Sequence, residues 1–421
     1  MKRIFTAALC AIAIFASCEE SGMNTVSVTV EVDESKLESI KPESYEVVFT
    51  NTTTATATTA TTENGIATAN VMPGIYQIVV KSSVAEDGKF YAITGSMKDV
   101  NILTSGETYT ITVDMVAESQ LIFKEIYYTG SVFETGEIKE DGTPSTSNYF
   151  RDQFYEIYNN SDEVAYADGL CIFEIAYANW DYSIVYEYAF ADGTPASKDE
   201  YVFGQNIWQI QGNGTDFPIQ PGESIIIAQW ATNHKDDKLT KGFSPVDLSG
   251  AEFEAVEEEK EAYGGIVLTD NAAHNMKLAT CPTGYAPPQW LTSVSGTRMV
   301  LAKPSEPLRQ DNWCVSSNTE TPANYCEVKI ADVLDAVQMI ADESVVTDNH
   351  LGMPIMLDAG YIWCKSSYSA QSVSRKQAGT LANGSIKYAD TNNTVDDFVV
   401  NDTPVIRRDG AKVPSWNTWI K

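Results

Sequence analysis

Residues 26–32 have the sequence Val-Ser-Val-Thr-Val-Glu-Val, and this stretch decides the fold class. Every second residue is a valine, and the residues between the valines are polar or charged. Alternation with a period of two places all the valines on one face of a β-strand and the polar side chains on the other. We therefore expect the folded part of the chain to begin with a half-buried strand.

The same kind of pattern recurs as far as residue 116. Asn64-Gly65 and Pro73-Gly74 are pairs typical of tight turns, and a Thr/Ala-rich stretch at residues 50–62 fits either an exposed strand or a loop. The expected strands are residues 26–32, 45–49, 66–71, 76–80 and 109–115. Together they predict a small antiparallel β-sandwich over residues 24–116.

The pattern restarts at Leu121 and predicts a second, larger all-β domain. Apolar and aromatic runs are separated by turn sequences such as Asp168-Gly169 and Pro221-Gly222; the runs are residues 121–128, 154–158, 170–173 and 224–228. Two stretches between the runs have helical character. Residues 252–261 are acidic and helix-prone, and residues 329–341 carry apolar side chains at helical spacing, so both predict short helices.

Short motifs in both regions resemble known β-domains. The run from Asn64-Gly65 to Pro73-Gly74-Ile75-Tyr76 resembles the transthyretin-like, carboxypeptidase-regulatory type of sandwich, which implies a spacer or assembly module. Phe154-Tyr155-Glu156-Ile157-Tyr158-Asn159-Asn160, Pro221-Gly222 and Asp390-Thr391-Asn392-Asn393 resemble the lamin-tail domain, an immunoglobulin-like sandwich.

The whole chain is similar to an uncharacterised family of Bacteroidetes lipoproteins, the domain-of-unknown-function family numbered 4876. That resemblance implies a lamin-tail-like sandwich over residues 121–408, which is far longer than the roughly 100 residues of a simple sandwich. About half of this region must therefore consist of insertions. Residues 409–421 form a C-terminal tail with two tryptophans that we expect to dock on the core.

The first residues have the composition of a secretory signal. Lys2 and Arg3 precede an apolar run, residues 4–16, that is too short to span a membrane, and Cys18 follows directly. This resembles a bacterial lipobox and implies cleavage after residue 17, acylation of Cys18 and a lipid anchor. The alternative is a secreted protein with a cysteine near its cleavage site.

Residues 18–24 would then form a lipidated tether. Its acidic start, Glu19-Glu20-Ser21, resembles the export signal of surface lipoproteins in Bacteroidetes, and the alternative is a solvated tether without a sorting role. We expect a location in the outer membrane, on the cell surface, with the lipid as the only anchor.

Composition excludes some classes of partner. The formal net charge is −30, and nucleic-acid binding depends on Lys and Arg that neutralise phosphates, so we expect no nucleic-acid partner. Cationic or neutral ligands remain open, and the acidity can also serve only to keep a surface protein soluble.

Signatures of catalysis and of metal binding are absent from the sequence. The three histidines, His234, His274 and His350, have no metal-binding spacing, and no nucleophile elbow, phosphate loop or dinucleotide fingerprint occurs. Acidic turns such as Asp141-Gly142 lack the run of ligands that calcium requires. We expect no enzyme activity, no cofactor and no metal.

Aromatic residues are the candidates for ligand binding. The densest stretch, residues 177–188, and two isolated sites supply Trp180, Tyr182, Tyr186, Trp208 and Trp290. Such rings can stack on sugars or contact a protein, although the same pattern also fits the core face of a sandwich.

Five cysteines remain besides Cys18 and Cys10, which lies within the signal. Cys314 and Cys326 are close enough in sequence for a disulfide in an oxidising compartment, and free buried thiols are the alternative.

The sequence favours a non-enzymatic surface lipoprotein that binds a protein partner or assists an outer-membrane transport protein in nutrient import. One alternative is a module for glycan binding or adhesion. A hydrolase with an unrecognised site in the insertions is the other.

Overall fold

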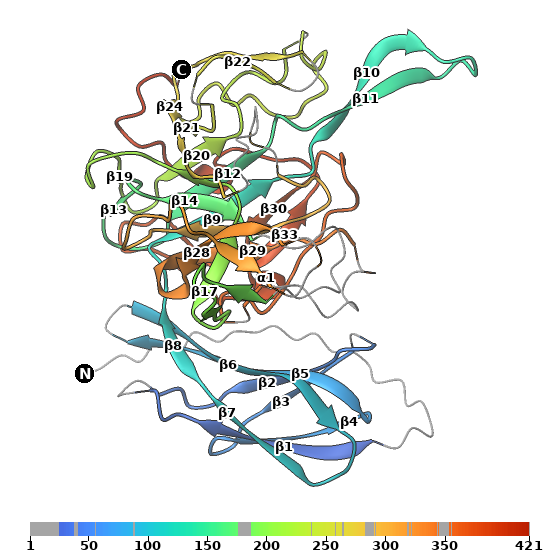
Figure 1. Ribbon diagram of the computed structural model, residues 1–421, viewed down its shortest axis with the longest axis vertical. Coiled ribbons are helices and arrows are strands. Elements are labelled where there is room, and N and C mark those ends of the chain that lie inside the picture. Colours follow the sequence, from blue (N-terminus) through green and yellow to red (C-terminus); the bar gives the residue numbers. More distant parts are fainter. Residues whose placement is uncertain are drawn as a thin grey trace.

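The computed structural model shows an all-β protein. It describes residues 25–37, 41–54, 56–86, 89–175, 187–236, 238–256, 258–262, 265–282, 290, 292–317, 320, 322–342, 344, 353–354 and 356–420. A small sandwich lies beneath a larger domain, and both consist almost entirely of strands (Figure 1).

The small domain packs a three-stranded sheet on a five-stranded sheet. The first has the order β4 (Ile66–Val71), β1 (Val26–Asp33), β7 (Glu107–Thr112). The second has the order β3 (Ala57–Thr61), β2 (Glu46–Asn51), β5 (Gly74–Glu86), β6 (Lys89–Ile102), β8 (Asp114–Ala117). Four of the predicted strands are found as β1, β2, β4 and β5, and the fifth, residues 109–115, is divided between β7 and β8 of different sheets. In the Thr/Ala-rich stretch the described residues form a turn and the edge strand β3.

The alternation in β1 has the expected consequence. Val28 and Val30 are fully buried, and the core between the two sheets also contains Phe49, Ile78 and Ile111. One feature differs from an antiparallel sandwich, because β1 pairs with β7 in parallel. A parallel pair requires a long crossover, and here the strands β2 to β6 lie between β1 and β7 in sequence.

Two larger sheets form the centre of the second domain, with the main apolar core between them. The seven-stranded sheet has the order β24 (His274–Asn275), β21 (Phe253–Glu254), β20 (Ser224–Ala228), β12 (Phe154–Asn159), β9 (Leu121–Tyr127), β30 (Ser372–Arg375), β33 (Phe398–Asn401). The facing sheet has the order β25 (Lys277–Thr280), β18 (Ile207–Gln209), β14 (Cys171–Glu174), β26 (Arg298–Ala302), β29 (Val333–Gln338).

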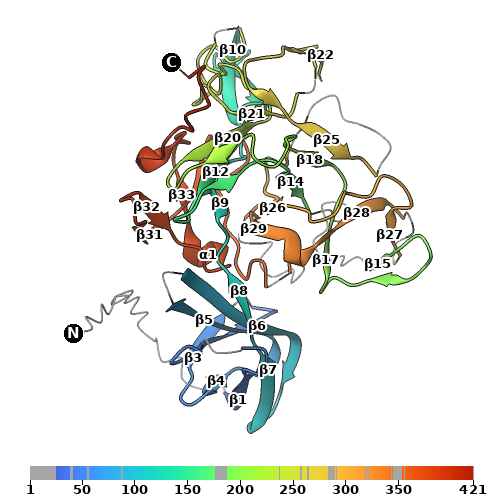
Figure 2. The ribbon, with the colours of Figure 1, turned by 90° about the vertical axis from the view of Figure 1, so that its left-hand side faces the viewer.

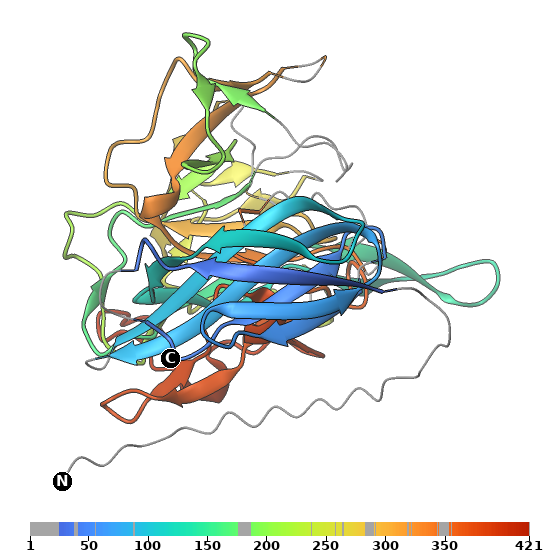
Figure 3. The same ribbon diagram turned by 90° about the horizontal axis from the view of Figure 1, so that it is seen from below.

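Insertions add smaller sheets to this centre. A further five-stranded sheet has the order β16 (Pro195–Ala196), β15 (Tyr188–Ala189), β27 (Cys314–Ser316), β28 (Asn324–Lys329), β17 (Tyr201–Gly204). The remaining pairs are β13 (Ala165–Tyr166) with β19 (Pro218–Ile219), β22 (Lys260–Glu261) with β23 (Val267–Leu268), and β31 (Gln377–Thr380) with β32 (Ile386–Tyr388). The hairpin of β10 (Ser131–Ile138) and β11 (Pro144–Tyr149) projects from the body (Figures 1 and 3).

Both predicted helices are wrong. Residues 252–261 contain the strands β21 and β22, and residues 329–341 form a 3₁₀ turn, η1 (Ile330–Asp332), followed by β29. The last four residues of β29 are all buried, so apolar residues occur on both faces of this strand. Their spacing therefore resembles that of a helix although the segment is extended. Within the described ranges the one α-helix is the single turn α1 (Thr394–Asp397), and a 3₁₀ turn, η3 (Arg408–Gly410), lies near the C-terminus.

The C-terminal tail docks as expected. The indole N–H groups of Trp416 and Trp419 donate hydrogen bonds to the carbonyls of Pro218 and Ala251. These bonds hold the tail against the ends of β19 and β21. No helix in the described part of the chain is long and apolar enough to cross a membrane.

The two domains meet where β8 leads directly into β9 (Figure 2). Two ion pairs join them at this boundary: Lys81 contacts Asp396, and Lys387 contacts Glu118 in the connecting segment. The joint therefore carries polar contacts, and two cavities lie along it.

Candidate functional site: a pocket at the joint between the domains

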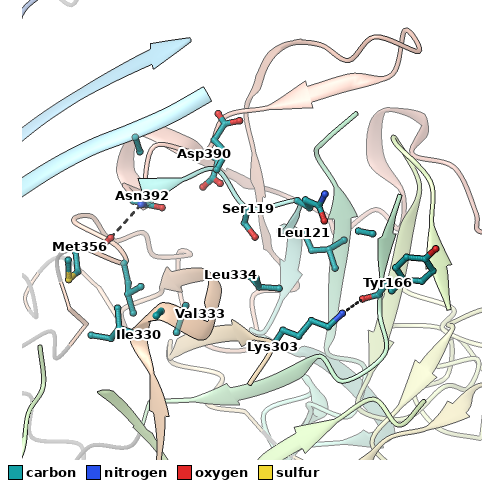
Figure 4. A pocket seen from close by; sticks show the side chains of 16 residues that line it. Ser119, Leu121, Tyr166, Lys303, Ile330, Val333, Leu334, Met356, Asp390 and Asn392 are labelled. Atoms are coloured by element: carbon teal, nitrogen blue, oxygen red, sulfur yellow. Dashed lines mark hydrogen bonds between the residues drawn. The ribbon is translucent and has the colours of Figure 1, made fainter. Parts of the chain in front are cut away.

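The larger cavity has a volume of about 470 Å³ and lies between β6 of the small sandwich, the connecting segment and the edge of the large domain. Domain boundaries are common positions for ligand pockets, and pockets for small molecules usually have volumes of about 300–1,000 Å³. Figure 4 shows its lining side chains. We refer to this cavity as the joint pocket.

The floor of the joint pocket is apolar. Leu121 comes from the start of β9, Ile330 from η1, and Val333 and Leu334 from the start of β29. Val333 and Leu334 are only partly buried, unlike the rest of β29, because the strand emerges from the core at this end. Leu357, from the segment before β30, adds to the same surface.

One end of the joint pocket is acidic. The side chain of Asp390 is only 5% exposed and lies 3.2 Å from Nη1 of Arg375. The oxygen at this distance is Oδ1, which in the described part of the chain has this ion pair but no hydrogen bond, and the buried hydroxyl of Ser119 has no hydrogen-bond partner. Buried polar atoms are almost always hydrogen-bonded, so two such atoms at one pocket call for an explanation.

Arg375 shows why this end keeps a surplus of negative charge. Its Nη2 donates to both carboxylate oxygens of Asp335 at 2.7 Å, and its Nη1 lies 3.3 Å from Asp397. With Asp390, three buried carboxyl groups therefore surround one guanidinium. Burial raises the pKa of Asp390 and outweighs the opposite effect of Arg375, because Asp335 and Asp397 are also close.

A second acid–base pair stands at the rim of the acidic end. Glu118 accepts from Lys387 at 2.7 Å, and both side chains are mostly buried. Burial raises the pKa of Glu118, and its contact with Lys387 only partly offsets this. Lys387 also lies close enough to Asp390 to lower its pKa, so Lys387 and Arg375 together face the carboxyl groups of this end.

The opposite end of the joint pocket is cationic. Lys303 is exposed, and its Nζ donates to the carbonyl oxygen of Tyr166 at 3.2 Å. Figure 4 shows this pair on the far side of the apolar floor from Asp390 and Ser119. The two ends of the joint pocket therefore carry opposite charges.

The second cavity at the joint, about 350 Å³, is less suited to a ligand. Its buried carboxyl group, Asp358, already accepts hydrogen bonds from the backbone of Gln338, Gly360 and Thr394 and from the Thr394 hydroxyl. Burial raises the pKa of Asp358 to about 7. We interpret it as a residue that fixes the loops beside the joint.

The two predicted aromatic site residues that the structure describes lie in the core. Trp208 and Trp290 are 1% and 4% exposed, and their rings lie 6.2 Å apart in the main core, where Tyr155 stacks on Trp290 at 5.2 Å. The prediction that these two bind ligand is wrong, because a sandwich core of this size buries large rings. Trp180, Tyr182 and Tyr186 lie outside the described residues.

The cysteines and histidines among the described residues form no metal site or disulfide. Cys314 and Cys326 lie on the paired strands β27 and β28 as free thiols, so the structure shows no disulfide between them. His234 is buried; it bonds to Tyr149 and Trp230, and burial lowers its pKa to about 4. Cys18 and His350 lie outside the described residues, among which no group of His, Cys, Asp or Glu side chains could hold a metal.

The sequence analysis identified Asp390 only as part of a motif that resembles the lamin-tail domain, and it missed Ser119 and Arg375 as site residues. The sequence offers only weak indications that these residues form a site. Arg375 is a cation beside an apolar strand, and Asp390 follows the buried Tyr388 closely. Only the fold brings the two together with the connecting segment.

Comparisons with known proteins identify a family and a solved relative. Residues 220–405 match a family described as protein of unknown function, DUF4876. The crystal structure of a DUF4876 family protein from Bacteroides thetaiotaomicron is 32% identical, with a TM-score of 0.58, and the match covers 93% of this chain and 99% of that one.

A candidate adhesin from Bacteroides ovatus is much less similar. It is 8% identical with a TM-score of 0.18, over 74% of this chain and 84% of that one, and it supports no argument. No curated protein matches the sequence.

Proposed function

The chain belongs to the DUF4876 family of proteins of unknown function, and from this premise we propose that it is a lipid-anchored surface protein that binds a small ligand between its two β-domains. Binding proceeds without chemical conversion of the ligand. The observation that carries the proposal is the joint pocket, which combines an apolar floor with two buried oxygen atoms, Oγ of Ser119 and Oδ1 of Asp390, that make no hydrogen bond to the described residues.

The anchor is supported by the sequence. Two cations, a short apolar run and Cys18 have the order of a lipoprotein signal, and acyl chains on Cys18 would hold the mature protein at the outer membrane. The acidic residues Glu19 and Glu20 support export to the cell surface.

The absence of conversion is an inference from the arrangement of the polar groups. Nucleophilic catalysis needs a hydroxyl or thiol within hydrogen-bond reach of a base. Among the described residues the hydroxyl of Ser119 has no hydrogen-bond partner of any kind, and Asp390 is held by a guanidinium. Turnover of any compound in a panel of glycans and peptides by the purified mature chain would contradict this part of the proposal.

Ligand binding can be tested by a thermal-shift screen of the mature chain against amines, peptides, sugars and fatty acids. Ala331 is exposed and lines the joint pocket, so Ala331→Trp fills the space without disturbing the core. Ala191→Trp, at an exposed turn away from the pocket, is the matched control. We expect hits that stabilise the native chain and the control equally but not Ala331→Trp; hits that persist in Ala331→Trp would place binding elsewhere.

The anchor has its own test. We expect the Cys18→Ser variant to lose incorporated palmitate and to leave the membrane fraction, because an unacylated chain has no membrane anchor. Fractionation of cells and labelling with a palmitate analogue measure this. Retention of the variant in the outer membrane would contradict lipid anchoring.

We also propose that the bound ligand is delivered to an outer-membrane transport protein. A two-domain binding protein on a lipid tether is free to approach a membrane partner. Pull-down through a C-terminal tag after gentle solubilisation should recover one transport protein in stoichiometric amount, and recovery of the lipoprotein alone would contradict this role.

A further inference from the structure

The joint pocket has properties that define a class of ligand, and this inference rests on the proposed function. We propose that the pocket recognises an organic cation, whose primary amino group meets Asp390 and Ser119 and whose apolar part covers Leu121, Val333 and Leu334. The juxtaposition of a charged acceptor, a neutral acceptor and an apolar floor carries the proposal.

The first support is the balance of charge at the acidic end. Asp335, Asp390 and Asp397 share Arg375, and Lys387, which binds Glu118, also lies near Asp390, so four carboxyl groups face two cations. One more positive charge would therefore be attracted, and one more negative charge repelled. Charge-assisted hydrogen bonds between an ammonium and a carboxylate are about twice as strong as neutral ones.

The second support is the hydrogen bonding of two buried oxygen atoms at the pocket. Among the described residues Oγ of Ser119 has no hydrogen-bond partner, and Oδ1 of Asp390 has its ion pair with Arg375 but no hydrogen bond. Buried acceptors without hydrogen bonds are energetically unfavourable. A primary ammonium carries three N–H donors, so it can satisfy both atoms and still donate to a third group.

The third support is that the acidic group and the cationic group lie at opposite ends of the pocket. The apolar floor separates Asp390 from Lys303, whose charge opposes a second cation at that end. A single amino group on an apolar chain therefore fits better than a diamine. The chain would cover Leu334 and Val333, which the protein itself leaves partly exposed.

Isothermal titration calorimetry with three probes of one length tests the inference: 1-hexylamine, 1-hexanol and hexanoate. We expect 1-hexylamine to bind about tenfold more tightly than 1-hexanol, a difference of about 1.4 kcal/mol. We expect hexanoate to bind more weakly than either, because the carboxylates repel it. 1,6-Diaminohexane should bind more weakly than 1-hexylamine, because Lys303 opposes its second charge.

Two variants locate the recognition. Asp390→Asn should weaken 1-hexylamine about tenfold and leave 1-hexanol unchanged, and the variant should fold, because Arg375 retains Asp335 and Asp397. Lys235→Ala, the matched control at an exposed position that does not line the pocket, should bind 1-hexylamine as the native chain does. Thermal unfolding of both variants confirms that the fold is intact.

The outcomes separate the two claims. Equal binding of 1-hexylamine and 1-hexanol, lost in Ala331→Trp, would overturn the cation class but keep the pocket. Tighter binding of hexanoate, or native affinity of 1-hexylamine for Asp390→Asn, would also overturn the class. No binding of any probe, together with no hits in the thermal-shift screen, would overturn the proposed function itself.

Discussion

In the N-terminal sandwich the buried side chains are apolar or uncharged, and the ionised groups stand at the surface; in the C-terminal domain ionised groups occupy the central strands. Among its described residues the small sandwich buries only Asn and Thr as polar residues, and its pair Lys36–Asp114 is 60% and 40% exposed. In the large domain Lys124, Glu125 and Glu156 on β9 and β12 are at most 1% exposed.

The difference follows from what covers each sheet. The seven-stranded sheet is covered on one face by the main core and on the other by the C-terminal segment. Arg407 and Arg408 of that segment bind Glu252 and Glu125, and Lys124 binds Glu156. A sheet buried on both faces can retain charges only if each is paired. Asp390, at the edge of this network, has an ion pair with Arg375 but no hydrogen bond to Oδ1 from the described residues, and the pocket lies there.

The largest expected effect comes from removing the central cation of the network. Arg375→Ala leaves Asp335, Asp390 and Asp397 without their shared partner, and breaking a buried ion pair costs about 3–5 kcal/mol. Urea unfolding followed by tryptophan fluorescence measures this, because all eight tryptophans lie at residue 180 or beyond.

The exposed pair of the small sandwich is the control for this comparison. Lys36→Ala should change the free energy of unfolding by no more than about 1 kcal/mol. A loss below 1 kcal/mol in Arg375→Ala as well would mean that the buried charges are hydrated and that the contrast between the domains does not hold.

The second effect is a pH dependence of the large domain. Burial raises the pKa of Asp358 to about 7 and that of Asp152 to about 6. Groups with raised pKa values bind protons more readily when folded, so their stabilising contribution is present at low pH and is lost as pH rises through these values. From pH 6 to pH 8 we expect the large domain to lose about 1–2 kcal/mol, measured by tryptophan fluorescence in urea.

The small sandwich should respond in the opposite direction and at lower pH. Hydrogen bonds from Tyr109 and Thr104 lower the pKa of Glu107 to about 2, and a bond from Thr112 lowers that of Asp33. Stability from these groups is present above pH 4.5 and is lost as pH falls toward 2. Circular dichroism should show no change in this domain between pH 6 and 8; a loss there equal to that of the large domain would contradict the contrast.

A third, smaller effect tests the apolar core of the small sandwich. Ile78 on β5 is fully buried, and Ile78→Val removes one methylene at a cost of about 0.5–1.5 kcal/mol. Hydrogen exchange should show faster opening of β2 and β5 and unchanged protection of β9 and β12. Equal acceleration in both domains would show that they unfold as one unit.

The smallest effect concerns the contact between the domains. Lys81 binds Glu46 within the small sandwich and Asp396 in the large domain, but these acids are about half exposed. Lys81→Ala should therefore cost less than about 1 kcal/mol and leave both cores unchanged. A loss as large as that of Arg375→Ala would mean that the joint, rather than the buried network, holds the fold together.

The contrast also explains what the sequence could predict. In the small sandwich one face of β1 packs on the core and the other faces solvent, so the alternation from Val26 to Val32 was sufficient to identify this strand. The strand β29 shows no alternation of apolar and polar residues, because its last four residues are all buried. Asp335 can be among them because it is neutralised by Arg375, some 40 residues away in sequence. The residues of β29 were therefore predicted as a helix.

The joint pocket could not be predicted for the same reason. Asp390, Ser119 and Leu334 belong to three segments that are distant in sequence, and only the packing of β9, β29 and the loop before α1 brings them together. The aromatic residues were the stronger signal in the sequence, and Trp208 and Trp290 proved to be core residues.

The most direct test of the pocket is hydrogen–deuterium exchange of the mature chain with and without 1-hexylamine. We expect added protection confined to the segments around residues 118–121, 330–334 and 387–392, and none in Ala331→Trp. Protection in the projecting hairpin of β10 and β11, or at the docked tail, would contradict this expectation, as would unchanged exchange throughout.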